Sequence, residues 1–354
     1  MIVILSATFV SRAQEFSGED EEQFRLAMDY TDNGNANGAI EIYDQLLKKY
    51  PGSAKVQYEL AYCHYVNQDF KRAAKILEKA EKGDDIAAMY ALHGNCFDMM
   101  GKKGKAIAKY KEGIAKYPDS GLLYVELGIV YGKSNDLGSA VVSYVKGIGV
   151  DPYYLPNYYR ASQLLFATEP VWGLIFGEIH ELLQPNSKRS EELSMLMYHA
   201  YADNMKFKSD STYHFYLTLT PRVSMTADGE LDIPFELLYE TLVSSRSEGL
   251  DTVREKGRLD MLSLVEDRKV FLTRCFADEA NQKYLFPVFK YQQMVLEAGH
   301  WEAYNMWLFR KGDEEEFSSW LGANGAKFKA FVDWFNANHF DPIGTVESKT
   351  ISPE

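Results

Sequence analysis

Cysteine, positive charge and long apolar runs are all scarce in this chain. Only 3 Cys occur among 354 residues, which excludes a disulfide-dense scaffold. No apolar run reaches the roughly 18 residues of a membrane-spanning helix, so an integral helical membrane protein is not expected. Asp and Glu (51) outnumber Lys and Arg (38) and give a net charge of -13. An acidic protein repels phosphate backbones, which argues against nucleic-acid binding.

Sequence signatures of common catalytic sites are missing as well. There is no P-loop, dinucleotide-binding fingerprint, nucleophile elbow or protein-kinase motif. Glu297 and His300 would present two metal ligands on one helix face, but helical-bundle metal sites need such a pair twice. We therefore expect no catalytic residue, no cofactor and no metal ion, and a protein that is not an enzyme.

The N-terminal segment has the pattern of an export signal. An apolar run over residues 1–10 is followed by small residues at Ser11 and Ala13 and then by an acidic stretch. Nothing basic precedes Ile2, which departs from that pattern. We expect residues 1–13 to be a signal peptide, either complete or truncated at its start, and the protein to be exported to the periplasm or envelope. The alternative is a cytoplasmic adaptor whose N-terminal segment packs on the body.

A pattern recurs four times in the first half of the chain. Ala39, Ala73, Ala106 and Ala140 stand 34, 33 and 34 residues apart, and each is followed four residues later by Tyr or Leu. In three copies a Pro follows eight residues after that Tyr. A second pattern precedes each Ala, and in the fourth copy it consists of Tyr124, Leu127, Gly128 and Tyr131. A fixed period of this length is typical of a repeat architecture.

These residues resemble the tetratricopeptide repeat, a pair of helices. The resemblance covers residues 20–186 and implies a mainly α protein, with a right-handed α-solenoid of four clear repeats and a degenerate fifth. Two residues depart from the family pattern: Asp85 replaces the closing Pro of the second copy, and His93 replaces a Leu in the third. Cys63 and Cys96 hold the same position in successive copies, too far apart for a disulfide, so we expect reduced core thiols.

The resemblance also implies a groove lined by the first helix of each repeat, which binds a protein or peptide. Phe24 and Met28 stand where some relatives carry a clamp for a C-terminal carboxylate, so such a clamp is not expected here. The family's inward positions give an aromatic, apolar wall with few charges. An external partner or another part of this chain could fill the groove. The candidate groove residues are Phe24, Met28, Tyr58, Tyr62, Tyr65, Asn95, Lys133, Tyr159 and Phe166.

The second half matches no family that we can name. Residues 187–342 are expected to be mostly helical, and residues 343–354 to form a loose tail. Alternating side chains over residues 212–220 predict a strand that pairs with residues 231–235, in a small β-hairpin near residues 211–235. Four Trp lie on apolar helical stripes and are expected in a core rather than at a surface. They are Trp301, Trp307, Trp320 and Trp334.

Two function classes follow from these patterns. The first is a non-enzymatic scaffold or adaptor of the bacterial cell envelope that binds a protein in the repeat groove, with Tyr58, Tyr62 and Tyr65 as anchors. The second places a ligand-binding domain, for example for a glycan, or a catalytic domain in the C-terminal half, with the repeats as a docking arm. Glycan binding would require exposed Trp rings, so the exposure of the four Trp distinguishes the two.

Overall fold

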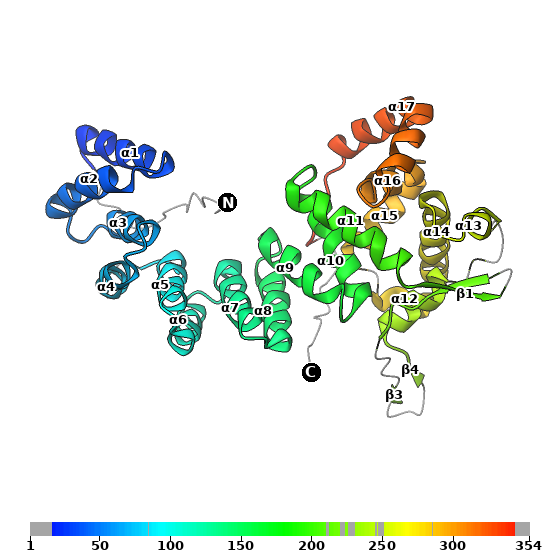
Figure 1. The fold of residues 1–354 in the computed structure, drawn as a ribbon, viewed down its shortest axis with the longest axis horizontal. Helices are drawn as coiled ribbons and strands as arrows, with labels where there is room; N and C mark the ends of the chain where they lie inside the picture. Colours follow the sequence, from blue (N-terminus) through cyan, green and yellow to red (C-terminus); the bar gives the residue numbers. More distant parts are fainter. Residues whose placement is uncertain are drawn as a thin grey trace. The chain divides into compact units, whose positions relative to one another are not determined.

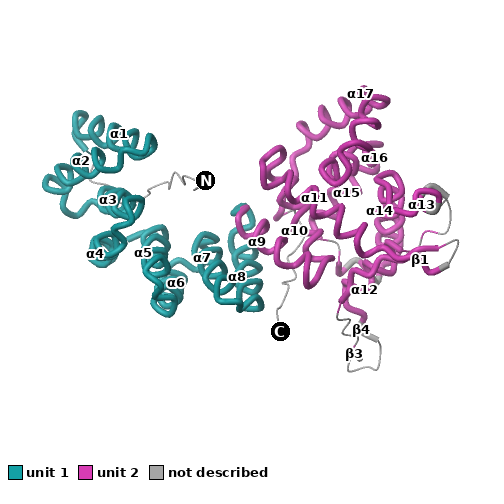
Figure 2. The backbone as a smooth tube through the Cα atoms, viewed as in Figure 1, with its two compact units in different colours: residues 1–154 teal, residues 155–354 magenta. Residues whose placement is uncertain are grey.

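The computed structural model describes residues 16–83, 85–209, 212–219, 224–225, 231–244, 246, 251–284 and 286–343. The predicted signal segment and most of the predicted tail lie outside these residues. The chain divides into two compact units, residues 1–154 and residues 155–354 (Figure 2). The division falls after the fourth repeat. The fifth helix pair, which the sequence assigns to the repeat domain, thus lies in the second unit.

Unit 1 consists of the four predicted helix pairs, joined by short turns (Figure 1). Polar caps set where several helices begin: Ser17 and Asp136, for example, accept hydrogen bonds from backbone amides of the first turn. The pairs are α1 (Gly18–Asp32) with α2 (Ala36–Lys49), α3 (Ala54–Val66) with α4 (Phe70–Ala80), α5 (Ala87–Met99) with α6 (Lys103–Lys116), and α7 (Gly121–Lys133) with α8 (Leu137–Val150).

Small residues let the two helices of a pair approach closely. A Cβ atom at Gly94 would lie 2.2 Å from Cε1 of Tyr110, and the ring of this tyrosine is fully buried in that space. Each pair also packs on the next one, and one buried cluster spans α5, α6 and α7. Stacking thus buries apolar surface that a single pair would leave exposed.

Unit 2 is mostly helical and carries two very short sheets. Its helices are α9 (Leu155–Leu165), α10 (Pro170–Leu183), α11 (Lys188–Ala202), α12 (Phe235–Val243), α13 (Asp251–Lys256), α14 (Met261–Ala277), η1 (Glu279–Tyr284), α15 (Pro287–Glu297), α16 (Trp301–Leu308) and α17 (Glu314–Ala337). Helix α17 bends at Asn324, which has a non-helical backbone conformation. Helix α10 is apolar nearly all round and almost wholly buried, which makes it the central helix of this unit.

The strand pairing differs from the sequence prediction. Strand β2 (Thr212–Phe215) pairs with β1 (Met205–Ser209), an antiparallel neighbour that precedes it in the chain. The segment expected as its partner contributes β4 (Leu231–Asp232), which pairs with β3 (Ser224–Met225) instead. Only two residues of the chain separate β1 from β2, and this favours the nearer partner because a short loop costs less entropy to close.

The core of unit 2 holds three of the four Trp singled out above. Trp301, Trp307 and Trp320 are buried, and Trp334 is partly buried against Tyr291. The indole N–H of Trp301 donates to the backbone carbonyl of Val265 at 2.9 Å. These rings therefore stabilise the unit as core residues. All three Cys are buried and free, as predicted.

Candidate functional site

The candidate site is the inner face of unit 1, by which we mean the side formed by α1, α3, α5 and α7. These first helices contact one another from repeat to repeat, whereas the second helices contact one another less. The stack therefore curves toward the first helices. Three tyrosines of α3, namely Tyr58, Tyr62 and Tyr65, are half-buried here and pack against the core between the second and third repeats.

Side chains from three repeats converge on these tyrosines. Burial, together with the carboxylates of Glu126 on α7 and Asp98 on α5, raises the pKa of Tyr65 to about 12. Burial also raises the pKa of Tyr58, with contributions from Glu59 and again Glu126. An electrostatic effect of this kind requires proximity. Glu126 of the fourth repeat and Asp98 of the third therefore lie near the tyrosines of α3.

The inner face is more acidic than the sequence indicates. Glu59 lies beside the tyrosines on α3, and burial raises its pKa to about 7, although Lys55 acts in the opposite direction. Glu59 and Glu126 hold the same position in the second and fourth repeats, directly after Tyr58 and Val125. The recurrence of Glu at this position could have identified both residues as part of the inner face. The family's groove-lining positions do not include it, so both are absent from the predicted groove residues.

The other predicted groove residues of unit 1 differ in exposure and in their polar contacts. Phe24 is fully buried, and the ammonium group of Lys55 lies 3.9 Å from its ring centroid, so a partner could not reach it. Met28 is 38% exposed and remains accessible. Asn95 accepts a hydrogen bond of 2.5 Å from the hydroxyl of Tyr110. Lys133 pairs with Asp98 at 2.6 Å, which neutralises part of the acidic charge.

The two remaining predicted residues, Tyr159 and Phe166, belong to unit 2. Tyr159 is buried, and its hydroxyl donates to Glu192 at 2.6 Å. Phe166 fills the space above Gly173, where a Cβ atom would lie 2.9 Å from its ring. Both side chains contribute to the packing of α9, α10 and α11. Tyr159 and Phe166 thus belong to a different unit from the tyrosines of α3.

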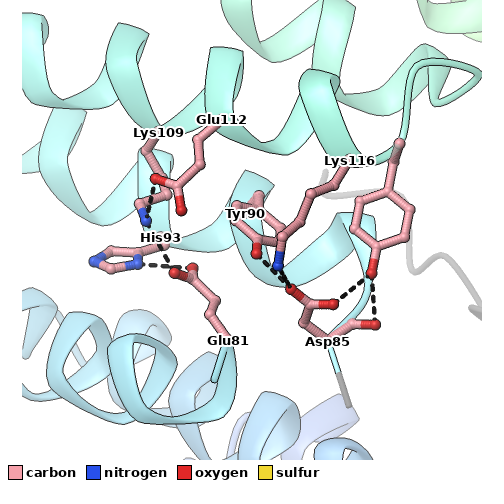
Figure 3. Close-up of polar contacts among 8 residues, drawn as sticks. Glu81, Asp85, Tyr90, His93, Lys109, Glu112 and Lys116 are labelled. Carbon is pink, nitrogen blue, oxygen red and sulfur yellow. Dashed lines mark hydrogen bonds and ion pairs between the residues drawn. The ribbon is translucent and has the colours of Figure 1, made fainter. Parts of the chain in front are cut away.

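A polar cluster joins the second and third repeats, and it contains His93, one of the two departures from the family pattern (Figure 3). His93 Nδ1 lies 2.8 Å from Glu81 Oε1, and Lys109 donates to the other carboxylate oxygen of Glu81 at 2.9 Å. The side chains of His93 and Glu81 are nearly inaccessible to solvent. This histidine therefore has a structural partner and is placed to hold the linker rather than to meet a ligand.

Asp85, the other departure, anchors the same linker a few residues later. Its carboxylate accepts hydrogen bonds from Tyr117 at 2.7 Å, from Lys116 at 2.5 Å and from Tyr90 (Figure 3). Burial opposes ionisation, but these hydrogen bonds outweigh it and hold the pKa of Asp85 below its usual value. Charged contacts thus replace the Pro that closes other repeats.

Several polar groups in the core of unit 2 pair with one another. Arg268 donates to Glu178 at 2.5 Å, and Gln292 donates to the other oxygen of this carboxylate at 2.6 Å. Arg310 pairs with Glu181 at 2.5 Å. Among the described residues, no group of three or more His, Cys, Asp or Glu could hold a metal ion. With Trp301, Trp307 and Trp320 buried, these rings offer no exposed platform for a glycan.

Within the part of the chain that the structure describes, no helix is both long and apolar enough to cross a membrane.

Among curated proteins, no sequence matches this chain. Solved structures with similar folds cover about half of it, and their TM-scores are low. MamA is 21% identical with a TM-score of 0.36, over 44% of this chain and 91% of MamA. TTC0263, a thermophilic TPR protein of Thermus thermophilus, is 14% identical with a TM-score of 0.42, over 51% of this chain and 98% of its own. PilW, a type IV pilus biogenesis factor, is 14% identical with a TM-score of 0.43, over 52% and 86%.

The sequence itself carries the family assignment. The model of a tetratricopeptide repeat family matches residues 30–96, which span the second helix pair and parts of its neighbours. Four helix pairs follow one another in unit 1 with the spacing of that repeat. The glycines that allow close helix contact, such as Gly94 and Gly128, lie against the large residues that the repeat pattern predicts. Unit 1 is thus built of tetratricopeptide repeats.

Proposed function

We propose that this protein is a non-enzymatic scaffold that binds a protein or peptide partner on the inner face of its repeats. One observation carries the proposal: Tyr58, Tyr62 and Tyr65 form a half-buried aromatic row to which Glu126 of another repeat is also close. Aromatic side chains bury large areas at small cost in conformational entropy, which suits protein recognition. Carboxylates beside them favour a partner segment that carries Lys or Arg.

The exposed apolar residues on this face support the same proposal. Met99 is 52% exposed at the end of α5, and Met28 is 38% exposed on α1. Methionine adapts to irregular partner surfaces because its side chain is flexible and polarizable. Both residues flank the tyrosine row in the stack of first helices. A partner that lies along this face could therefore cover apolar surface from three successive repeats.

A site-specific photo-crosslinker tests this proposal without disturbing the core. We would place a benzoylphenylalanine at Met99 on the inner face and, as a matched control, at Val142, which is 39% exposed on the second helix α8. The expected result is a discrete crosslinked protein from position 99 in native cells, absent from position 142. Crosslinking of the same protein from both positions, or from position 142 alone, would contradict an inner-face site.

A substitution experiment complements the crosslinking. Replacing Tyr58, Tyr62 and Tyr65 together by Phe keeps the ring packing and removes only the hydroxyl groups, whereas Ala at Tyr62 alone removes one ring. We expect the partner to be retained by the Phe variant and weakened by Tyr62→Ala, because the ring area supplies the affinity. If Tyr62→Ala and the wild type recovered equal amounts of the partner, the binding surface would not include this tyrosine row.

We further propose that the mature protein acts in the cell envelope. The support is the apolar segment and small residues at positions 1–13, which resemble a secretory signal. Mass spectrometry of the N-terminus of protein from native cells tests this point. A start at Gln14 is the expected result. An unprocessed N-terminus would favour the cytoplasmic adaptor and would leave the inner-face proposal unaffected.

A further inference from the structure

Helix α4 carries a row of positive charge on its exposed side. Lys71, Arg72, Lys75 and Lys79 are all exposed, and their spacing places them on one side of the helix. The row extends over about 12 Å, given the rise of an α-helix. It stands out because the whole chain has a net charge of -13.

The row lacks the counter-charges that some other lysines of unit 1 have. Lys49 pairs with Asp20, Lys116 with Asp85 and Lys133 with Asp98, all at 2.5 or 2.6 Å. None of the four α4 side chains forms an ion pair or a side-chain hydrogen bond with the residues that the structure describes. Like charges one helical turn apart repel one another, and an anionic partner would relieve that repulsion.

The four cations lie around a shallow, open depression of the surface. With Asp69 and Ile76 they line this depression, which has a volume of about 410 Å³. Ile76 is partly buried and packs against two core clusters, those of the first two repeats and of the second and third repeats. Its side chain is therefore held in place where it lines the depression. It offers apolar contact at Ile76 and positive charge around it.

We propose that this depression binds an acidic segment of a partner protein. The separation of Lys71, Lys75 and Lys79 matches that of Asp or Glu residues one helical turn apart on a partner helix. The apolar side chain of Ile76 suits a protein side chain, and the acidic balance of the whole chain disfavours nucleic acid. This site lies on the second helix of its repeat, apart from the inner face formed by first helices. The proposal therefore stands independently of the proposed function.

A charge-reversal experiment tests this site. The probe is a fluorescein-labelled helical peptide with Glu at every fourth position and Leu beside each Glu, and its binding to the full chain is followed by fluorescence anisotropy at low salt. The test variant is Lys75→Glu/Lys79→Glu. The control is Lys111→Glu/Lys146→Glu, which makes the same change in net charge at exposed positions of α6 and α8. Circular dichroism melting establishes that both variants fold.

The expected result is a tenfold or greater loss of peptide affinity in the α4 variant and less than a twofold change in the control. Added salt should weaken wild-type binding, because the attraction is between exposed charges. Equal losses in both variants would overturn the proposal in favour of a net-charge effect. No binding by the wild type would also overturn it, as would binding to phosphatidylglycerol vesicles without binding to the peptide, which indicates a lipid surface instead.

Discussion

Gly128 of α7 and Tyr144 of α8 share one space, since a Cβ atom at Gly128 would lie 2.3 Å from Cε1 of the tyrosine ring. We predict that Gly128→Ala lowers the free energy of unfolding by about 1–3 kcal/mol, because an overpacked contact forces the helices apart. Urea denaturation measures the change.

Gly132 provides the matched control in the same helix. A Cβ atom there would lie 3.9 Å from that of Ala140, an ordinary contact. Gly132→Ala should stabilise the protein by up to about 1 kcal/mol, because Ala has the higher helix propensity. Equal unfolding midpoints for the two variants would mean that the Gly128–Tyr144 contact does not limit the packing.

The second prediction concerns Asp85 in the linker between the second and third repeats. Its folded-state pKa is held below the usual value, so the stabilisation is present above that usual value and is lost as pH falls through the folded-state pKa. We expect Asp85→Asn to cost about 1–2 kcal/mol at pH 7 and less at pH 3. Denaturation at both pH values checks this.

Asp119→Asn serves as the comparison for Asp85, because Asp119 is exposed and forms no hydrogen bond or ion pair among the described side chains. It should change the unfolding free energy by less than about 0.5 kcal/mol at either pH. A pH-independent loss in Asp85→Asn would show that its charge is not what stabilises the linker.

The third prediction compares neighbouring cations on α14. Arg268 is buried with Glu178, whereas Lys269 forms an exposed pair of 3.7 Å with Glu266. We expect Arg268→Met to destabilise unit 2 by about 3–5 kcal/mol, because Glu178 would keep a buried charge without its main counter-charge. Lys269→Met should cost less than about 1 kcal/mol. Similar midpoints for both would refute the role of the buried pair.

The fourth prediction concerns Glu59 on the inner face. Burial raises its folded-state pKa to about 7, above the unfolded value, so the folded state is penalised increasingly as pH rises between the two values. Glu59→Gln should therefore raise the unfolding free energy by about 1–2 kcal/mol at pH 8 and hardly change it at pH 4. Exposed Glu41→Gln is the control. A gain that is the same at both pH values would show that ionisation is not its cause.

The repeats were readable from the sequence because their signals are local. The Gly and Tyr of one helix pair stand within about 16 residues of each other, and the period carries them from copy to copy. The same reasoning could not show that Phe24 is covered by Lys55, a residue of the next repeat. Nor could it detect the acidic inner face, since Glu126 lies far along the chain from the tyrosines that it affects.

The pairing of strand β2 shows what sequence patterns fail to predict between segments that are close in the chain. Alternation over residues 212–220 indicated a strand, of which Thr212–Phe215 forms one in the structure. Alternation alone does not select a partner, and the preceding segment at Met205–Ser209 pairs with it. The core of unit 2 shows what sequence patterns fail to predict between residues that are far apart in the chain. Its central ion pair joins residues 90 positions apart, Glu178 and Arg268, and no pattern along the chain connects them.

Periodicity and residue size in the sequence alone determined that this is a repeat protein, with helix pairs held close by Gly–Tyr contacts and three reduced Cys in its cores. Only the tertiary structure decided which side chains share a surface. It separated the fifth helix pair from the first four, buried Phe24, and left the cations of α4 without partners among the described residues. The reason is physical: helical spacing follows from local backbone geometry, whereas burial and charge pairing depend on residues brought together from distant parts of the chain.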